Sequence, residues 1–157
     1  MSTTQPGVAA ATPRTPQIGP PPYGAPMSLD TAKRAMAAAE AEAKKNSWSV
    51  AIAILDTTGS LVLFQKLDNT STLSVGVAEG KARAALDSRR PTKSLQDAIA
   101  SGGVGLRLLS IPNLHTAEGG VPIIVDGKVV GSIGASGVTS EQDAQVAMTG
   151  AAAVGST

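Results

Sequence analysis

The chain has 157 residues and a formal net charge of +1, and 42% of its residues are hydrophobic, which suits one domain with a core of its own. Basic and acidic residues are interspersed and aromatic residues make up only 2%, so the sequence lacks the basic surface and the stacking side chains typical of nucleic-acid-binding proteins. The chain contains no cysteine and one histidine, which excludes disulfides, thiolate catalysis, cysteine zinc sites and an intrachain multi-histidine metal site.

Residues 1–27 hold most of the ten prolines and almost no large aliphatic side chains. This composition predicts a flexible or polyproline-like arm ahead of a single domain at 28–157. The arm lacks the basic start and the apolar run of a secretion signal, and no later window reaches the roughly 18 apolar residues of a membrane span. We therefore expect a soluble, cytoplasmic protein with no membrane partner, although a trimmed exported protein would show the same pattern.

The first predicted elements are a helix, a hairpin and a second helix. Ser28 is a good N-cap for a helix over 29–46, whose apolar residues recur at helical spacing and whose last turn is basic. Two apolar runs at 50–56 and 61–67 flank a Thr-Thr-Gly-Ser loop, which predicts a hairpin. Small helix-forming residues over 73–88 predict a helix that can pack very close to a neighbour.

The stretch from Pro91 to the next strand carries a weaker pattern. Thr92 is expected to cap a short helix that ends near residue 100, before two glycines. One or two further turns are expected over 104–110, and a fifth strand around 108–114.

A second hairpin is predicted near the end of the chain. The dipeptide Asp126-Gly127 supplies the positive φ angles of a two-residue turn between β-branched runs at 121–125 and 128–135. Thr139 then begins a capping box with the glutamine three residues later, followed by a helix to about residue 153. Because consecutive strands are joined by hairpins, we expect a mainly antiparallel sheet covered by helices, an α+β layered domain.

Several blocks of the sequence resemble the GlcG/HbpS-like family, which also includes the C-terminal domain of PduO-type proteins. Over about residues 28–153 they read, in order, AIAILDTTGSLVLFQKLD, EGKARAA, RRPT, EGGVPIIVDGKVVGSIGASG and TSEQDAQVA. The resemblance implies a profilin-like α/β/α layered domain with about five strands, assembling into homo-oligomers up to octamers. Several members bind haem and some are described as haem-degrading or redox-responsive, so the resemblance implies haem as a cofactor.

Lys81 is the first candidate for a ligand contact. It lies on a predicted helical face of alanines, too small and apolar for an ordinary solvated surface, and it matches the family's lysine in EGKARAA. A cation there could hold a carboxylate or a haem propionate. The alternative is an ammonium paired with an acid such as Glu79 or Asp68.

The segment from Glu118 to Pro122 is the second candidate. Gly119 and Gly120 would present bare backbone at a strand start, with the Glu118 carboxylate beside them as a hydrogen-bond acceptor or general base. The alternative is a tight loop in which the glycines only permit positive φ and Pro122 marks the first residue of a strand or a sheet edge.

Three more residues are candidates for binding an anion or iron. Ser136 ends a glycine-flanked strand just before a capped helix, where free amides and the helix dipole could accept an anion, although such a segment is more often a close turn. Asp143, in that helix's first turn, is interpreted as a dipole partner. His115 is the only imidazole and a candidate haem iron ligand, the alternative being a solvated loop residue. Arg107 could pair with an anion or be ordinary surface charge.

These residues support three classes of function. The first is a haem-binding oligomeric module of the GlcG/HbpS type, with Lys81 and the glycine-flanked hairpin at the site. The second is an isomerase, hydratase or lyase acting on a small anionic metabolite, with Glu118 as base and Lys81 or Arg107 as anion clamp. The third is a structural or regulatory oligomer whose proline-rich arm docks a partner.

Overall fold

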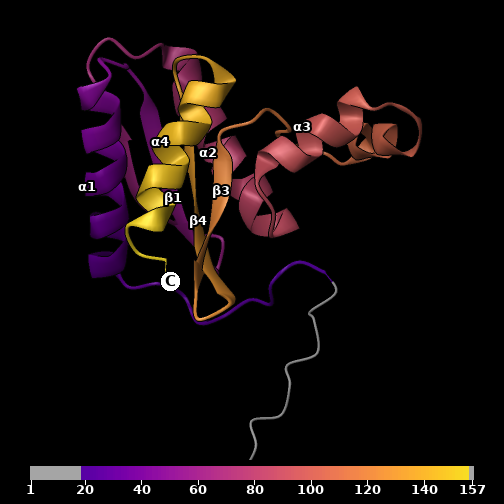
Figure 1. The fold of residues 1–157 in the computed structure, drawn as a ribbon, viewed down its shortest axis with the longest axis horizontal. Coiled ribbons are helices and arrows are strands. Elements are labelled where there is room, and N and C mark those ends of the chain that lie inside the picture. Colours follow the sequence, from indigo (N-terminus) through magenta and orange to yellow (C-terminus); the bar gives the residue numbers. More distant parts are fainter. Residues whose placement is uncertain (1–18, 156–157) are drawn as a thin grey trace, which may run out of the picture.

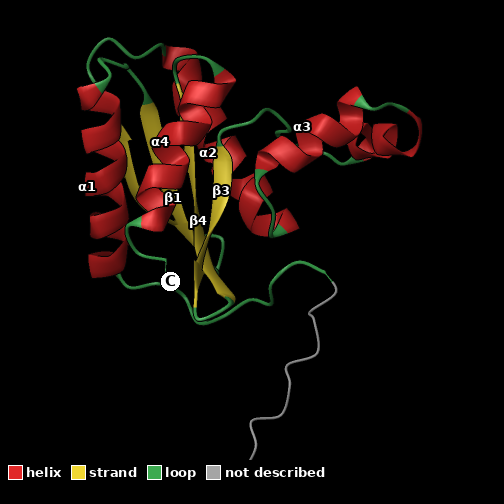
Figure 2. Cartoon of the chain, in the orientation of Figure 1, coloured by secondary structure: helices red, strands yellow, loops and turns green. Residues whose placement is uncertain are grey.

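The computed structural model describes residues 19–155 and contains a four-stranded antiparallel sheet between two layers of helices (Figure 1, Figure 2). In chain order the elements are α1 (Leu29–Lys45), β1 (Ala51–Asp56), β2 (Leu61–Lys66), α2 (Thr72–Ser88), α3 (Thr92–Ala100), the 3₁₀ helix η1 (Gly103–Ser110), β3 (Gly120–Val125), β4 (Lys128–Ser136) and α4 (Ser140–Ala152). The sheet order is β2-β1-β4-β3. The α+β layered fold predicted from the sequence is confirmed.

Each face of the sheet is covered by different helices. Helices α1 and α4 lie side by side on one face and bury the larger of two apolar clusters, which includes Ile52, Ile54 and Ile133. Helix α2 covers the other face over β4, β1 and β3, where alanines such as Ala78 and Ala82 fill the second cluster. Figure 1 shows that α3 and η1 form an arm that projects away from these layers.

Local sequence signals account for the ends of several elements. The Ser28 hydroxyl accepts a hydrogen bond from the Thr31 amide and caps α1 as predicted. Both halves of the predicted capping box at Thr139 are formed at the start of α4. Asp126 and Gly127 have φ angles of 51° and 73°, as the predicted two-residue turn requires.

Two predictions for the middle of the chain are wrong. Thr92 does not cap α3, because Pro91 occupies the N-cap position and the buried Thr92 hydroxyl instead accepts from the Gly120 amide at 2.9 Å. The strand expected over 108–114 is not formed. Within the described part of the chain, these residues belong to the end of η1 and to the loop that follows it. Gly102 and Gly103 both have positive φ, and this reversal leads into tight 3₁₀ turns away from the sheet.

Helix α2 packs directly onto the backbone of the sheet. A Cβ atom added at Gly134 would lie 2.3 Å from the Ala78 carbonyl oxygen, and one at Gly120 would lie 2.2 Å from that of Lys81. Contacts this short leave no room for any other residue type. The close approach explains how a core with few aromatics is filled.

The segment before α1 lies against the start of β4. The Gly24 amide donates to the Val129 carbonyl at 2.8 Å, the Val129 amide donates to the Pro22 carbonyl at 2.8 Å, and Met27 is buried. Residues 1–18 of the predicted arm lie outside the described residues. Among the described helices, none has the length and apolarity needed to cross a membrane.

Candidate functional site

Lys81 and Asp143 form a buried ion pair at one end of the sheet. Lys81 is only 2% exposed, and its Nζ donates to Asp143 Oδ2 at 2.8 Å and to the Ala135 carbonyl oxygen at 3.1 Å. Asp143 belongs to the first turn of α4, whereas Lys81 belongs to α2, so the pair joins the helical layers on opposite faces of the sheet. The partner is Asp143, where the sequence analysis named Glu79 or Asp68.

Gly119 makes this crossing possible. Its φ is +135°, and a Cβ atom there would lie 2.8 Å from Lys81 Nζ and 2.8 Å from the Ala135 carbonyl oxygen. A side chain would therefore collide with the ammonium group and strain the backbone at once. Lys81, Gly119 and Gly120 thus lie together in a packed junction of protein groups.

Asp143 is held by backbone amides as well as by Lys81. Its Oδ1 accepts from the Val138 amide at 3.1 Å. Burial raises the pKa of Asp143 above its usual range, and the Lys81 ammonium and the amides of Val138 and Gly137 oppose that rise. The turn after Ser136 was expected to bind an external anion. The Asp143 carboxylate of the chain itself accepts the hydrogen bond there instead.

Glu118 is buried directly ahead of this junction. Its amide donates to Gln96 Oε1 on α3 at 2.9 Å. Within residues 19–155, its carboxylate takes part in no hydrogen bond or ion pair. The role of a general base stays a prediction for Glu118.

His115 is exposed and rests on α2. A Cβ atom at Gly80 would lie 2.3 Å from the imidazole Cδ2, so the ring covers the bare backbone of that glycine. Its position as an iron ligand stays a prediction. Arg107 is exposed on η1, in the projecting arm, whereas Ser136 is buried at the end of β4.

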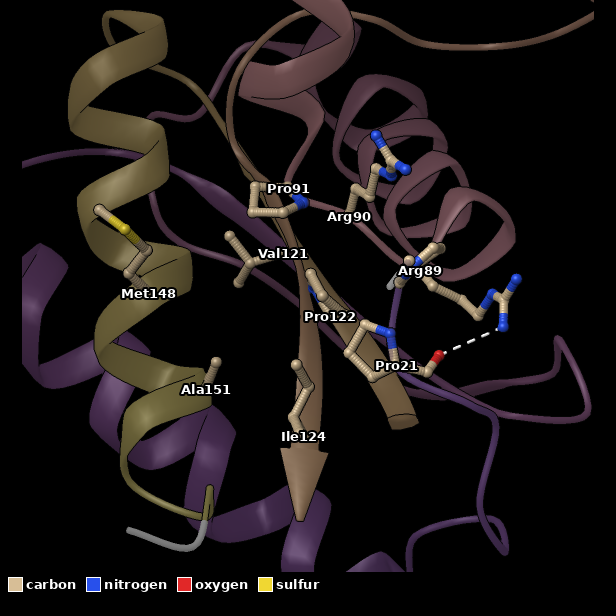
Figure 3. A pocket seen from close by; sticks show the side chains of 11 residues that line it. Pro21, Arg89, Arg90, Pro91, Val121, Pro122, Ile124, Met148 and Ala151 are labelled. Atoms are coloured by element: carbon tan, nitrogen blue, oxygen red, sulfur yellow. Dashed lines mark hydrogen bonds between the residues drawn. The ribbon is translucent and has the colours of Figure 1, made fainter. Parts of the chain in front are cut away.

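A groove that was not predicted from the sequence lies along the outer edge of β3, one of the two edge strands of the sheet (Figure 3). Its volume is about 670 Å³, and of the predicted site residues only Pro122 lines it. The lining residues are Gly19, Pro20, Pro21, Arg89, Arg90, Pro91, Val121, Pro122, Ile124, Met148 and Ala151. Four separate segments build the groove, so no single local motif could predict it. The sequence Arg-Arg-Pro at the end of a predicted helix was the one local feature that belongs to its lining.

The two sides of the groove differ in chemistry. Met148 and Ala151 of α4 form one side, and Pro21, Arg89 and Arg90 form the other (Figure 3). Arg89 donates to the Pro21 carbonyl oxygen at 3.3 Å, and its guanidinium lies 5.1 Å from the centre of the Tyr23 ring. The groove therefore combines an apolar surface with two cations.

Comparison with known proteins places the chain among haem-related proteins. A family model described as haem degrading protein HbpS-like matches residues 27–152. Protein GlcG of Escherichia coli K12 is 38% identical over 110 residues, which is 70% of this chain and 81% of GlcG.

Two solved structures share the fold over nearly their whole length. A double mutant of HbpS from Streptomyces reticuli has a TM-score of 0.77 at 28% identity, covering 98% of this chain and all of the other. A PduOC–haem complex has a TM-score of 0.74 at 26% identity, covering 82% of this chain and 94% of PduOC.

Proposed function

The chain belongs to the HbpS-like family, and on that premise we propose that it is a haem-binding protein. The observation that carries the proposal is the match of residues 27–152 to a family described as haem-degrading. The shared fold with a PduOC–haem complex supports it further. A fold alone does not define a ligand, so the proposal also has to agree with the side chains present.

The described residues suit haem in the volume of the groove and in donor chemistry. The groove along β3 falls within the range of about 300–1,000 Å³ that is usual for small-molecule sites, and most of its lining is apolar. An exposed imidazole at His115 and an exposed thioether at Met148 can each coordinate iron. Bound haem would supply an iron centre capable of electron transfer and oxygen chemistry, and the protein would supply binding and orientation.

We also propose that the protein forms a homo-oligomer. The projecting arm supports this, because η1 buries none of its side chains. Val104 is 83% exposed and Leu109 67%, and Leu106 and Ile111 are exposed beside them. Large aliphatic side chains gathered on one exposed element are typical of a surface that another chain covers.

The enzyme alternative gains nothing from the geometry. It used Lys81 or Arg107 as an anion clamp, and the Lys81 ammonium is already paired with Asp143 and the Ala135 carbonyl. Arg107 is exposed on η1 in the projecting arm. The finer prediction within the haem hypothesis is that the protein degrades haem or responds to redox state. Loss of the Soret band under a reductant and oxygen, compared with free haemin, would test it.

Haem binding is tested by titrating the purified full-length protein with haemin and following absorbance. An excess of albumin serves as competitor and removes non-specific association. We expect a saturable Soret band that survives the competitor. No band, or a band lost to albumin at once, would contradict the proposal.

A further inference from the structure

We propose that the groove along β3 is where the tetrapyrrole ring lies, with Arg89 and Arg90 binding its carboxylates. This inference rests on the proposed haem function and assigns a site to it. The groove runs along the outer edge of β3, between the end of α2 and the face of α4 (Figure 3). Neither the Lys81–Asp143 junction nor the loop of His115 lines it.

The apolar part of the groove suits a flat ring. Val121, Pro122 and Ile124 of β3 lie between Ala151 on the α4 side and Pro21 on the other side (Figure 3). These side chains are short or rigid, so covering them costs little conformational entropy. Val121 and Pro122 are buried, so the apolar surface that a ring would remove from water is mainly that of the half-buried Ile124, Ala151 and Pro21.

The edge of β3 is poorly suited to the other common occupant, an added peptide strand. The Gly120 amide already donates to Thr92 Oγ1 at 2.9 Å, and Pro122 has no amide hydrogen to donate. The Ile124 carbonyl oxygen lies 3.2 Å from the position of a Cβ at Gly155, so the C-terminal segment covers it. A strand added here would lose most of its hydrogen bonds, whereas a porphyrin needs none along its ring.

The two arginines suit the carboxylates of the same ligand. Within residues 19–155 neither guanidinium forms an ion pair, since the four ion pairs there all involve lysine. Arg89 is oriented by the Pro21 carbonyl and the Tyr23 ring, and Arg90 is exposed beside it. A guanidinium binds a carboxylate through paired hydrogen bonds, which a lysine cannot reproduce.

Met148 is the iron-binding side chain that this site offers. It is 52% exposed and stands on α4, across β3 from the arginines (Figure 3). The prediction for His115 and the groove proposal therefore name different iron ligands. In the groove proposal, Met148→Ala shifts the Soret maximum of the haem-loaded protein, whereas His115→Ala leaves it in place.

Metal-free protoporphyrin IX tests the groove without any contribution from iron coordination. Its fluorescence on titration with the full-length protein reports binding. Ala151→Trp fills the groove from α4, and Ala152→Trp places the same side chain one residue further along, outside the lining. Over the concentration range in which the wild type is saturated with protoporphyrin, we expect Ala151→Trp to show no saturable binding. We expect Ala152→Trp to bind like the wild type. Equal binding by both variants, with their folds verified by circular dichroism, would overturn the groove proposal.

The carboxylate contacts are tested separately with the double variant Arg89→Ala/Arg90→Ala. Its matched control is Lys33→Ala/Arg34→Ala, which removes the same charge from the exposed face of α1. We expect about a tenfold to hundredfold weaker protoporphyrin binding for the groove variant and no change for the control. Protoporphyrin dimethyl ester has no free carboxylate, so wild type and groove variant should bind it equally. A groove variant that binds protoporphyrin like the wild type would contradict the assignment.

Failure of this inference and failure of the haem function give different results. If haemin binds the wild type and survives albumin but also binds Ala151→Trp equally well, the site is elsewhere and the function stands. If the wild type binds neither haemin nor protoporphyrin, the proposed function itself fails.

Discussion

At the scale of single residues, the most consequential contact is the buried pair of Lys81 and Asp143. Two charges removed from water are tolerated because each has further partners, namely the Ala135 carbonyl for the ammonium and the Val138 amide for the carboxylate. Removing one charge leaves the other buried without compensation. We therefore interpret the pair as a structural link between α2 and α4.

Loss of either partner should strongly destabilise the protein. Lys81→Met is expected to lower the free energy of unfolding by about 3–5 kcal/mol, because it leaves the Asp143 carboxylate unpaired. Urea denaturation measures this, with Lys93→Met as the control, since that lysine pairs with Asp97 on the surface and should matter by no more than about 1 kcal/mol. Equal effects of the two variants would contradict the structural role.

The raised pKa of Asp143 gives stability a definite pH dependence. Above the ordinary carboxyl pKa, the unfolded chain has released the Asp143 proton while the folded chain still binds it. The folded state then binds more protons, so the contribution of this group to stability falls as pH rises through that window. Asp143→Asn should flatten the curve of unfolding free energy against pH there. An unchanged slope in the Asp143 variant would contradict the account.

At the scale of elements, the packing of α2 on the sheet depends on glycines that face its backbone. Gly134→Ala would place a Cβ 2.3 Å from the Ala78 carbonyl oxygen, so the helix must shift. We expect a loss of about 1–3 kcal/mol, as for overpacked cores. Gly76 lies in α2 with open space around its Cβ position, so Gly76→Ala should instead stabilise by about 0.5–1 kcal/mol. Thermal unfolding of both variants checks the opposite signs.

Local signals were sufficient to predict most elements but not the functional site. Ser28, Thr139 and Asp126-Gly127 act on neighbours a few residues away, so caps and turns could be predicted from the sequence. The partner of Lys81 is 62 residues away in the chain. The alanine-rich face around Lys81 indicated that the lysine is buried, but it did not indicate which acid pairs with it. The helix to about residue 100 and the turns over 104–110 were predicted correctly, whereas the strand over 108–114 was wrong, because apolar residues there resemble a strand when their exposure is unknown.

At the scale of the whole molecule, two exposed surfaces within residues 19–155 are candidates for binding, namely the projecting arm and the groove along β3. The groove residues come from positions near 20, 90, 122 and 148, so only the assembled fold brings them together. The arm exposes aliphatic side chains, and the groove exposes an apolar surface beside two cations. The first is suited to another protein chain and the second to a small anionic ligand.

Self-association through the arm can be tested by charge substitution. Val104→Glu/Leu109→Glu places two carboxylates among the exposed aliphatics of η1, at positions that are 83% and 67% exposed. We expect the wild type to run as an oligomer and the variant as a smaller species in size-exclusion chromatography with light scattering. Leu73→Glu, at an exposed position on α2, is the control. A variant with the mass of the wild type would contradict this role of the arm.

The most direct test of the central claim is the rate at which haem leaves the loaded protein for an excess of albumin. Absorbance at the Soret band follows the transfer for the wild type and for Ala151→Trp in parallel. The account predicts that the wild type retains haem, whereas haemin mixed with the variant, whose groove is filled, is not held and goes to albumin at once. Transfer from the wild type as fast as from the variant would contradict the claim that this protein holds haem in the groove along β3.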